Sequence, residues 1–354
     1  MQAIIRKVEA GERISYEEAL KLYTLDLFSL GKLAHKLRST RWGNKSFFNI
    51  NRHINPTNIC KDVCKFCAFS ASRKNPNPYT MSHEEIVKIV GESHANGAKE
   101  VHIVSAHNPE AGLEWYMNVF SKIKEAYPQM HVKALTAAEI HFLAQEYHHS
   151  YDEIIDMMVE SGVDSMPGGG AEIFDEDVRD VICKGKVTSK QWIEIHQLWH
   201  ERGKKSNATM LFGHIEDRHH RIDHMMRLRD LQDETGGFNT FIPLVYQRDN
   251  NFLNVKNFFS SQEILKTMAM SRIVLDNIPH LKAYWVTSTI NLALVSQEFG
   301  ADDLDGTIEK EMINAAAGAK SAGGMPLGEF VNFIKNSGFT PVERDSLYHE
   351  LKVW

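Results

Sequence analysis

The 354-residue sequence lacks several features that mark common classes of protein. It has no run of about 18 apolar residues, so we expect no membrane-spanning segment. Its first eleven residues carry charges that are spread too evenly for a secretory signal peptide. The net charge of -6 is distributed without long blocks of one sign, which gives no electrostatic reason to expect a nucleic-acid partner. We therefore expect a soluble protein of a reducing cytoplasm.

Cysteine is also scarce, because the chain has only four and they lack the paired spacing of a disulfide framework. Three of them, Cys60, Cys64 and Cys67, form the pattern Cys-x3-Cys-x2-Cys, whereas Cys183 is isolated. A structural zinc site normally has four protein ligands, and an iron-sulfur cluster held by protein alone takes four cysteines. Three thiolates therefore leave one metal position open for a substrate or cofactor. A zinc knuckle, or an incidental group of buried thiols, is the alternative.

From residue 46 onward, short apolar runs alternate with amphipathic helical patterns. The expected strands are residues 47–54, 101–104, 132–135, 163–166, 208–212 and 241–246, with 283–286 and 299–304 as two more. The expected helices between them are residues 82–96, 114–127, 138–145, 151–160, 189–202, 219–233 and 261–275. This alternation predicts parallel βαβ units. The regular repeat and the lack of a Gly-x-Gly-x-x-Gly turn favour an α/β fold of the TIM-type (β/α) barrel class, with eight strands, over an open doubly wound sheet.

Residues 1–45 are expected to form a helical extension, and residues 46–354 the barrel with C-terminal helices. Ser15 and Glu18 have the spacing of a capping box, which predicts a helix start. Apolar residues continue at helical spacing as far as Gly43 and predict two short helices. We expect these helices to close one end of the main body.

An aromatic residue, Phe66, directly precedes the third cysteine. With this feature the cysteine segment resembles the radical S-adenosylmethionine (SAM) enzymes. The resemblance implies one four-iron four-sulfur cluster per chain, held by the three cysteines, whose open iron chelates SAM. It also implies reductive cleavage of SAM, and therefore an electron donor such as flavodoxin or ferredoxin. The segment follows the first expected strand, on the side of a barrel where active sites lie.

Residues that directly follow the strands of such a barrel are expected to line one mouth. Many radical SAM enzymes have a Gly-Gly pair after the second strand, where this chain has Ser105 and Ala106, both small enough for close backbone approach to SAM. Glu139, near a helix start after the third strand, has two open roles: complementing the helix dipole or serving the site.

The fourth strand is followed by three glycines, Gly168, Gly169 and Gly170. Consecutive glycines cost conformational entropy, so they indicate either close backbone approach to a ligand or a tight turn. Glu172, which follows them, is the candidate for a hydrogen bond to the ribose or methionine part of SAM. The fifth and sixth strands of radical SAM barrels flank the adenine, and Pro243 in the sixth is assigned to that wall.

Histidine is abundant, with eighteen in the chain. Most histidines are surface residues or satisfied hydrogen-bond partners, and no His-Glu-x-x-His pattern supports a second metal. Three that fall near strand ends, His53, His107 and His214, are retained as candidate catalytic residues in the pocket.

Longer strings narrow the resemblance to one family. Residues 167–172, 207–210, 213–216, 229–238, 241–244 and 300–307 together resemble the aminofutalosine synthases of the futalosine route to menaquinone. The resemblance implies a transferase that adds the 5'-deoxyadenosyl radical to 3-[(1-carboxyvinyl)oxy]benzoate. The implied products are 6-amino-6-deoxyfutalosine and bicarbonate.

Other functions remain open. The cyclic dehypoxanthine futalosine synthases share the cysteine motif and the triple glycine, but they typically have Trp where this chain has Leu244, and a different loop at residues 302–305. Another radical SAM enzyme, such as a deazaflavin-type synthase, is a second alternative. A structural zinc-binding or nucleic-acid module would need a fourth ligand near the cysteines and a basic face, and the sequence shows neither.

Overall fold

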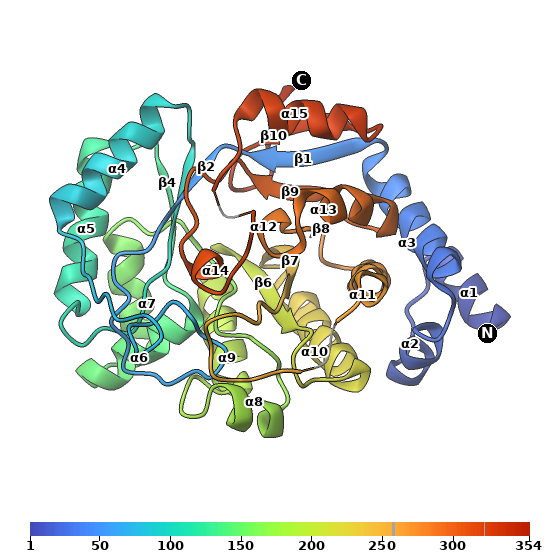
Figure 1. The fold of residues 1–354 in the computed structure, drawn as a ribbon, viewed down its shortest axis with the longest axis horizontal. Helices are drawn as coiled ribbons and strands as arrows, with labels where there is room; N and C mark the ends of the chain where they lie inside the picture. Colours follow the sequence, from blue (N-terminus) through green and yellow to red (C-terminus); the bar gives the residue numbers. More distant parts are fainter. Residues whose placement is uncertain (257–258, 322) are drawn as a thin grey trace.

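Parallel strands form the centre of the molecule, and helices surround them (Figure 1). The computed structural model describes residues 1–256, 259–321 and 323–354. Seven strands form one parallel sheet in chain order. They are β2 (Asn51–Ile54), β3 (Glu100–Ile103), β4 (His131–Ala134), β5 (Ser165–Met166), β6 (Lys205–Phe212), β7 (Phe238–Val245) and β8 (His280–Leu281).

A second sheet completes the ring of strands. Its order is β11 (Glu350–Val353), β10 (Thr340–Arg344), β1 (Lys45–Asn49) and β9 (Asp303–Gly306). Only one residue separates β1 from β2, so the same stretch of chain pairs with β9 at its start and with β3 at its end. A bridge between Lys282 and Asp303 connects the end of β8 to β9. The predicted TIM-type barrel is therefore confirmed, with β1–β2 and β3 to β9 as its strands.

The helices between the strands form the outer layer of the barrel. Several begin at a serine or threonine whose side chain accepts a backbone N–H of the first turn, as at Ser82, Ser150 and Thr188. The helices that follow β2 along the chain are α4 (His83–Ala95), α5 (Leu113–Ala126), α6 (Ala137–Tyr147), α7 (Tyr151–Glu160), α8 (Glu176–Ile182), α9 (Ser189–Glu201), α10 (Arg218–Thr235), α11 (Ser261–Val274), α12 (Trp285–Ser288), α13 (Ile290–Ser296), η1 (Gln297–Phe299), α14 (Ile313–Ala316) and α15 (Leu327–Asn336).

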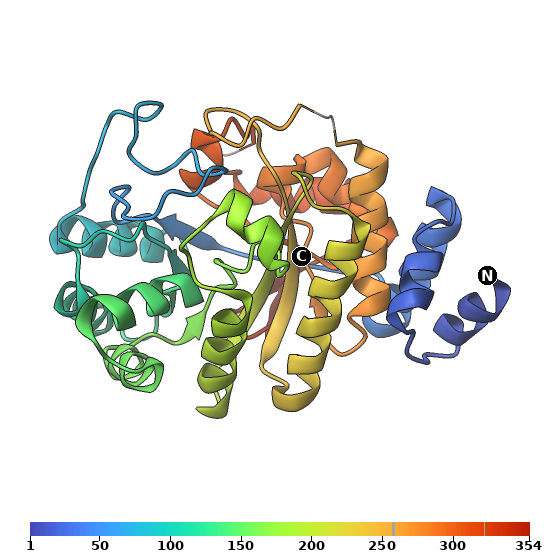
Figure 2. The same cartoon turned by 90° about the horizontal axis from the view of Figure 1, so that it is seen from below.

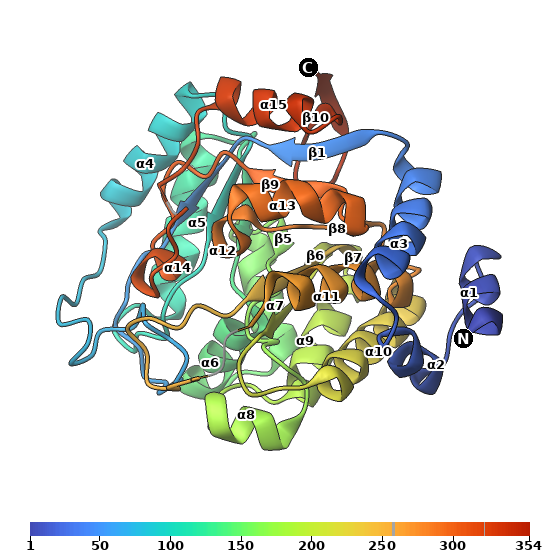
Figure 3. The same ribbon diagram turned by 45° about the vertical axis from the view of Figure 1, so that its right-hand side comes forward.

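The N-terminal extension contains α1 (Gln2–Glu9), α2 (Tyr16–Leu22) and α3 (Leu27–Trp42). The predicted capping box is present, since the Glu18 amide donates to Ser15 Oγ at 3.2 Å and the Ser15 amide donates to Glu18 at 2.8 Å. Helix α3 packs on α11 and α2 packs on α10, so the extension lies along the side of the helix layer rather than at an end (Figure 3). Helix α1 was not anticipated. The proposed division at residue 45 coincides with the start of β1.

One predicted strand is wrong. Residues 283–286 lie just after β8 and lead into helix α12, and the last strand of the ring starts at Asp303 rather than near residue 299. A short buried apolar run does not distinguish a strand from a helical turn by its pattern alone. Here Trp285 is fully buried and donates its indole N–H to Gly306 O, which fixes the turn against β9. In the described part of the chain, no helix has the length and apolarity to cross a membrane.

Candidate active site

A cavity of about 310 Å³ lies at the carboxyl ends of the barrel strands. Figure 2 shows the long loop between β2 and α4, the loop after β7 and helix α14 gathered on this edge of the barrel. Side chains from several strand ends line the cavity, as they do in barrel enzymes generally. The wall is more apolar than polar, as is usual for sites that bind small molecules.

The three cysteines of the motif share one part of the cavity wall. Backbone hydrogen bonds shape this loop: Cys67 N donates to Cys64 O at 3.1 Å, and Lys61 N donates to His107 O at 2.9 Å. Burial raises the pKa of the Cys60 thiol, and that of Cys64 more strongly. Thiols in such an environment stay protonated without a metal and release their protons when they bind one.

The triple glycine also lines the cavity, and two of its members need to be glycine for different reasons. A Cβ on Gly168 would lie 2.7 Å from Asn207 O, so β5 approaches β6 too closely for a side chain. Gly170 has φ +89°, in the left-handed region that favours glycine. The turn thus presents bare backbone to the cavity.

Glu172 and Lys186 form a partly buried ion pair in the same wall, with Oε1 and Nζ 2.7 Å apart. Burial opposes ionisation of Glu172, but the Lys186 ammonium outweighs this and lowers the pKa of the carboxyl. Lys186 Nζ also lies 5.7 Å from the centre of the Phe66 ring. Sequence reasoning missed Lys186, because nothing in its local pattern separates it from a surface lysine.

Glu139 braces the cavity from behind its wall. Its carboxylate accepts N–H groups from Ser105 at 2.8 Å and from Thr136 at 2.7 Å, so it joins the loop after β3 to the start of α6. Burial raises the pKa of Glu139. Ser105 and Thr136 line the cavity, whereas Glu139 does not. Glu139 therefore holds the backbone of these two segments in place.

Two imidazoles, those of His53 on β2 and His102 on β3, line the cavity. Their rings meet edge to face with centroids 4.6 Å apart. Each Nε2 is buried and has no hydrogen-bond partner among the described residues. Burial lowers the pKa of both histidines, that of His102 more strongly, so both are neutral. His53 was predicted as a pocket residue, whereas His102 was not among the three histidines retained as candidates.

The other two predicted histidines have local partners. His107 lines the cavity, but its Nδ1 lies 2.9 Å from Asp62 Oδ2, so it holds the cysteine loop. His214 lies outside the cavity wall. Its Nδ1 accepts the Ile215 N–H at 2.8 Å and its Nε2 lies 3.0 Å from Leu211 O. Both ring nitrogens of His214 are thus used within its own turn.

Pro243 is buried in β7 but does not line the cavity, whereas its neighbours Ile242 and Leu244 do. Alternate side chains of a strand point to opposite faces, which explains the difference. In this part of β7 the residues on either side of Pro243 thus line the cavity, and the adenine wall expected here stays a prediction.

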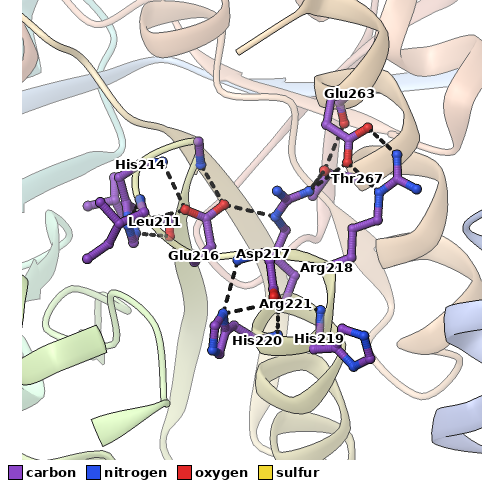
Figure 4. Close-up of polar contacts among 12 residues, drawn as sticks. Leu211, His214, Glu216, Asp217, Arg218, His219, His220, Arg221, Glu263 and Thr267 are labelled. Carbon is purple, nitrogen blue, oxygen red and sulfur yellow. Dashed lines mark hydrogen bonds and ion pairs between the residues drawn. The ribbon is translucent and has the colours of Figure 1, made fainter. Parts of the chain in front are cut away.

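The turn after β6 is held by a buried ion-pair network (Figure 4). Glu216 accepts the N–H groups of Gly213 at 2.7 Å and His214 at 2.8 Å, and it pairs with Arg221 Nε at 2.9 Å. Arg221 also donates to Glu263 Oε1 at 3.0 Å. The network joins the turn to α10 and α11, and Leu211, at the start of the turn, lines the cavity.

Comparison with known proteins shows the family to which the chain belongs. Residues 54–228 match the model of the radical SAM superfamily, and residues 235–353 match the CofH/MqnC C-terminal region. The chain is 43% identical to aminodeoxyfutalosine synthase of Thermus thermophilus, over 99% of this chain and 96% of the relative. It is 38% identical to the synthase of Streptomyces coelicolor, over 98% and 93%. The chain belongs to the radical SAM family that includes the aminodeoxyfutalosine synthases.

Two further similarities of this radical SAM protein are informative. It is 34% identical to cyclic dehypoxanthine futalosine synthase of Streptomyces coelicolor, over 100% of this chain and 89% of that one. The hydrogenase maturase HydG from Carboxydothermus hydrogenoformans has the same fold, with a TM-score of 0.78, 17% identity and coverage of 98% of this chain and 80% of that chain.

Radical SAM enzymes use a four-iron four-sulfur cluster together with SAM, and the cavity fits both. The cysteine loop offers three thiols on one wall, whereas Cys183 is buried and does not line the cavity. Among the described residues, no three His, Cys, Asp or Glu side chains are grouped closely enough to surround a single metal ion. Bare glycine backbone faces the same space as the thiols. Three cysteine ligands would leave one of the four cluster irons free to bind SAM.

Proposed function

We propose that this protein is an aminodeoxyfutalosine synthase. It joins the adenosyl part of SAM to 3-[(1-carboxyvinyl)oxy]benzoate and releases 6-amino-6-deoxyfutalosine and bicarbonate in menaquinone biosynthesis. The observation that carries this proposal is the full-length similarity to two such synthases, because it covers every loop that lines the cavity. The cavity adds physical support, since it combines three thiols, bare backbone and an apolar wall.

The cluster and SAM, when bound, supply the 5'-deoxyadenosyl radical. Cys60, Cys64 and Cys67 would hold the cluster, and the backbone of Ser105 and of the triple glycine would approach SAM. Glu172, oriented by Lys186, remains our candidate for a hydrogen bond to SAM. Phe66 packs beside this pair.

The substrate has two carboxylates, which need hydrogen-bond donors in a site that excludes water. His53 and His102 offer neutral imidazoles whose Nε2 atoms have no partner among the described residues. A buried polar atom without a partner costs about 1–3 kcal/mol, so a ligand that supplies the partner recovers this energy. We assign one substrate carboxylate to these two histidines. The benzoate ring would pack against the apolar wall of Leu211, Ile242, Leu244 and Val245.

The proposed reaction needs one electron from outside the chain. A flavodoxin or ferredoxin is the donor we propose, in the cytoplasm. All four cysteines are free thiols, which suits a reducing compartment.

Cyclic dehypoxanthine futalosine synthase is the second candidate, because this chain is 34% identical to one. Leu244 favours the first candidate, since it lies in the cavity wall at the position where the cyclases typically have Trp. A tryptophan there would fill space that the shorter leucine leaves open to a ligand.

Anaerobic incubation with reductant, SAM and 3-[(1-carboxyvinyl)oxy]benzoate tests the proposal, with products followed by mass. We expect one product that contains both adenosyl and benzoate parts, and none with the Cys67→Ala variant. The cyclase reaction would instead leave this substrate unchanged, close dehypoxanthine futalosine and release 5'-deoxyadenosine. That result would keep the radical SAM class and reject the synthase.

A further inference from the structure

The outer surface of the cysteine loop differs from the rest of the molecule in charge. The chain has a net charge of -6. Residues 60–74 nevertheless contain Lys61, Lys65, Arg73 and Lys74 against one acid, Asp62, which gives four positive charges minus one, or +3. Asp62 is directed inward to His107. The basic side chains of this segment are all exposed.

Two other segments lie against this loop and extend the surface. Lys65 N donates to Ile182 O at 2.8 Å, and Phe252 N donates to Lys65 O at 2.7 Å. The first contact brings exposed Lys184 to the loop. The second places the Phe252 ring under Arg73 and Lys74, at 5.3 and 4.6 Å from the ring centre. We call Lys61, Lys65, Arg73, Lys74 and Lys184 the basic rim.

Most of the basic rim has no acidic partner. In the described part of the chain, only Lys61 of these five forms an ion pair, with Glu146 at 2.6 Å. Arg13 and Lys36, which are exposed elsewhere on the molecule, do form ion pairs. Unpaired cations collected on a protein of net negative charge create a local positive potential, which steers an acidic partner to this face.

Exposed apolar side chains lie within the basic rim. Val63, between Cys60 and Cys64, is 80% exposed, and Val181, beside the Lys65–Ile182 contact, is 44% exposed. Small apolar centres surrounded by charge are typical of short-lived protein complexes. The inner side of this loop carries the three thiols that line the cavity. A partner seated on Val63 would therefore be separated from the thiols by the thickness of one loop.

We propose that the basic rim and Val63 form the docking surface for a small acidic one-electron carrier. The inference rests on the proposed function, which requires an external electron. A flavodoxin hydroquinone docked here would pass one electron to the cluster held by the cysteines and become the semiquinone. Electron transfer slows steeply with distance, so the loop that carries the thiols is the favourable place for contact.

The test compares a Lys65→Glu/Lys184→Glu variant with a Lys32→Glu/Lys335→Glu variant. The control pair is exposed, forms no ion pair within the described residues, and lies on α3 and α15, away from the cysteine loop (Figure 3). Each variant reverses two positive charges. Binding of oxidised flavodoxin is measured by calorimetry at low and high salt, and reduction by flavodoxin hydroquinone is measured by stopped flow.

We expect the rim variant to lose roughly 10- to 100-fold in association rate at low salt, within the range of electrostatic steering, and to lose the salt dependence of binding. The control should resemble wild type, and dithionite should drive SAM cleavage equally in all three proteins. Equal flavodoxin binding by the rim variant and wild type would overturn the proposal. An Arg73→Glu/Lys184→Glu variant repeats the test without a change between Cys60 and Cys67. Wild-type enzyme that fails to cleave SAM with dithionite would defeat the proposed function instead, while the binding comparison still tests the surface.

Discussion

Replacement of Arg221 by methionine tests the network that holds the turn after β6. Arg221 is buried, and its guanidinium donates to Glu216, Glu263 and Thr267 (Figure 4). It also donates to the Tyr23 hydroxyl at 2.9 Å. Methionine has a similar length but no charge, so it removes the cation and leaves the carboxylate of Glu216 buried. Removing one partner of a buried ion pair costs about 3–5 kcal/mol.

The remaining contacts place the expected loss near the lower end of that range. Glu216 keeps two backbone N–H donors, from Gly213 and His214, and Glu263 keeps its ion pair with Arg218 at 2.7 Å. We therefore expect the free energy of unfolding to fall by about 3 kcal/mol. SAM affinity should fall as well, because Leu211 in the cavity wall leads directly into this turn.

Urea unfolding followed by circular dichroism, with SAM binding measured by calorimetry, provides the two readouts. Lys88→Met is the control, because Lys88 forms only an exposed pair with Glu92 at 3.9 Å and should change stability by no more than about 1 kcal/mol. A Glu216→Gln/Arg221→Met double variant should lose less than the sum of the two single variants, since the amide needs no cation. A loss below about 1 kcal/mol in Arg221→Met would refute the reasoning that this pair is buried and required.

Three further predictions concern the site and the core. Cys60→Ala, Cys64→Ala and Cys67→Ala should each fail to retain the cluster, whereas Cys183→Ala should retain it, as iron counting after anaerobic reconstitution will show; the reverse pattern would reject the ligand set. Gly169→Val should weaken SAM binding while the cluster still assembles, because a Cβ at residue 169 would lie 2.7 Å from Thr136 Cγ2. Gly328→Val is the control, since a Cβ there meets nothing within 4 Å. Equal SAM affinity in the two variants would contradict the prediction. Burial lowers the pKa of His224 to about 3 from 6.5, so between pH 6.5 and about pH 3 the unfolded chain binds a proton at this histidine that the folded chain does not. The free energy of unfolding should therefore fall by up to ~1.4 kcal/mol for each unit by which the pH is lowered across this window. His224→Gln should remove this contribution when urea unfolding is measured against pH, and an unchanged pH slope in the variant would count against it.

Local patterns were sufficient for much of the barrel and for the cluster motif. The capping box at Ser15 was predicted correctly, because a cap depends on residues three apart. The strands from β2 to β7 were recognised because strand and helix periods differ over several residues. The strand predicted at residues 283–286 was wrong, since its apolar residues serve a helical turn that Trp285 anchors to Gly306.

The sequence by itself indicated the class of chemistry, because three cysteines within eight residues of one loop can reach a single cluster. It also determined that bare backbone follows the fourth strand, since glycine has no side chain. Only the tertiary structure decided which polar groups face the cavity. His102 and Lys186 line the cavity, whereas His214, Glu139 and Pro243 do not. The physical reason is that a side chain's role depends on partners from other strands: His214 finds both partners in its own turn, whereas Nε2 of His102 finds none among the described residues.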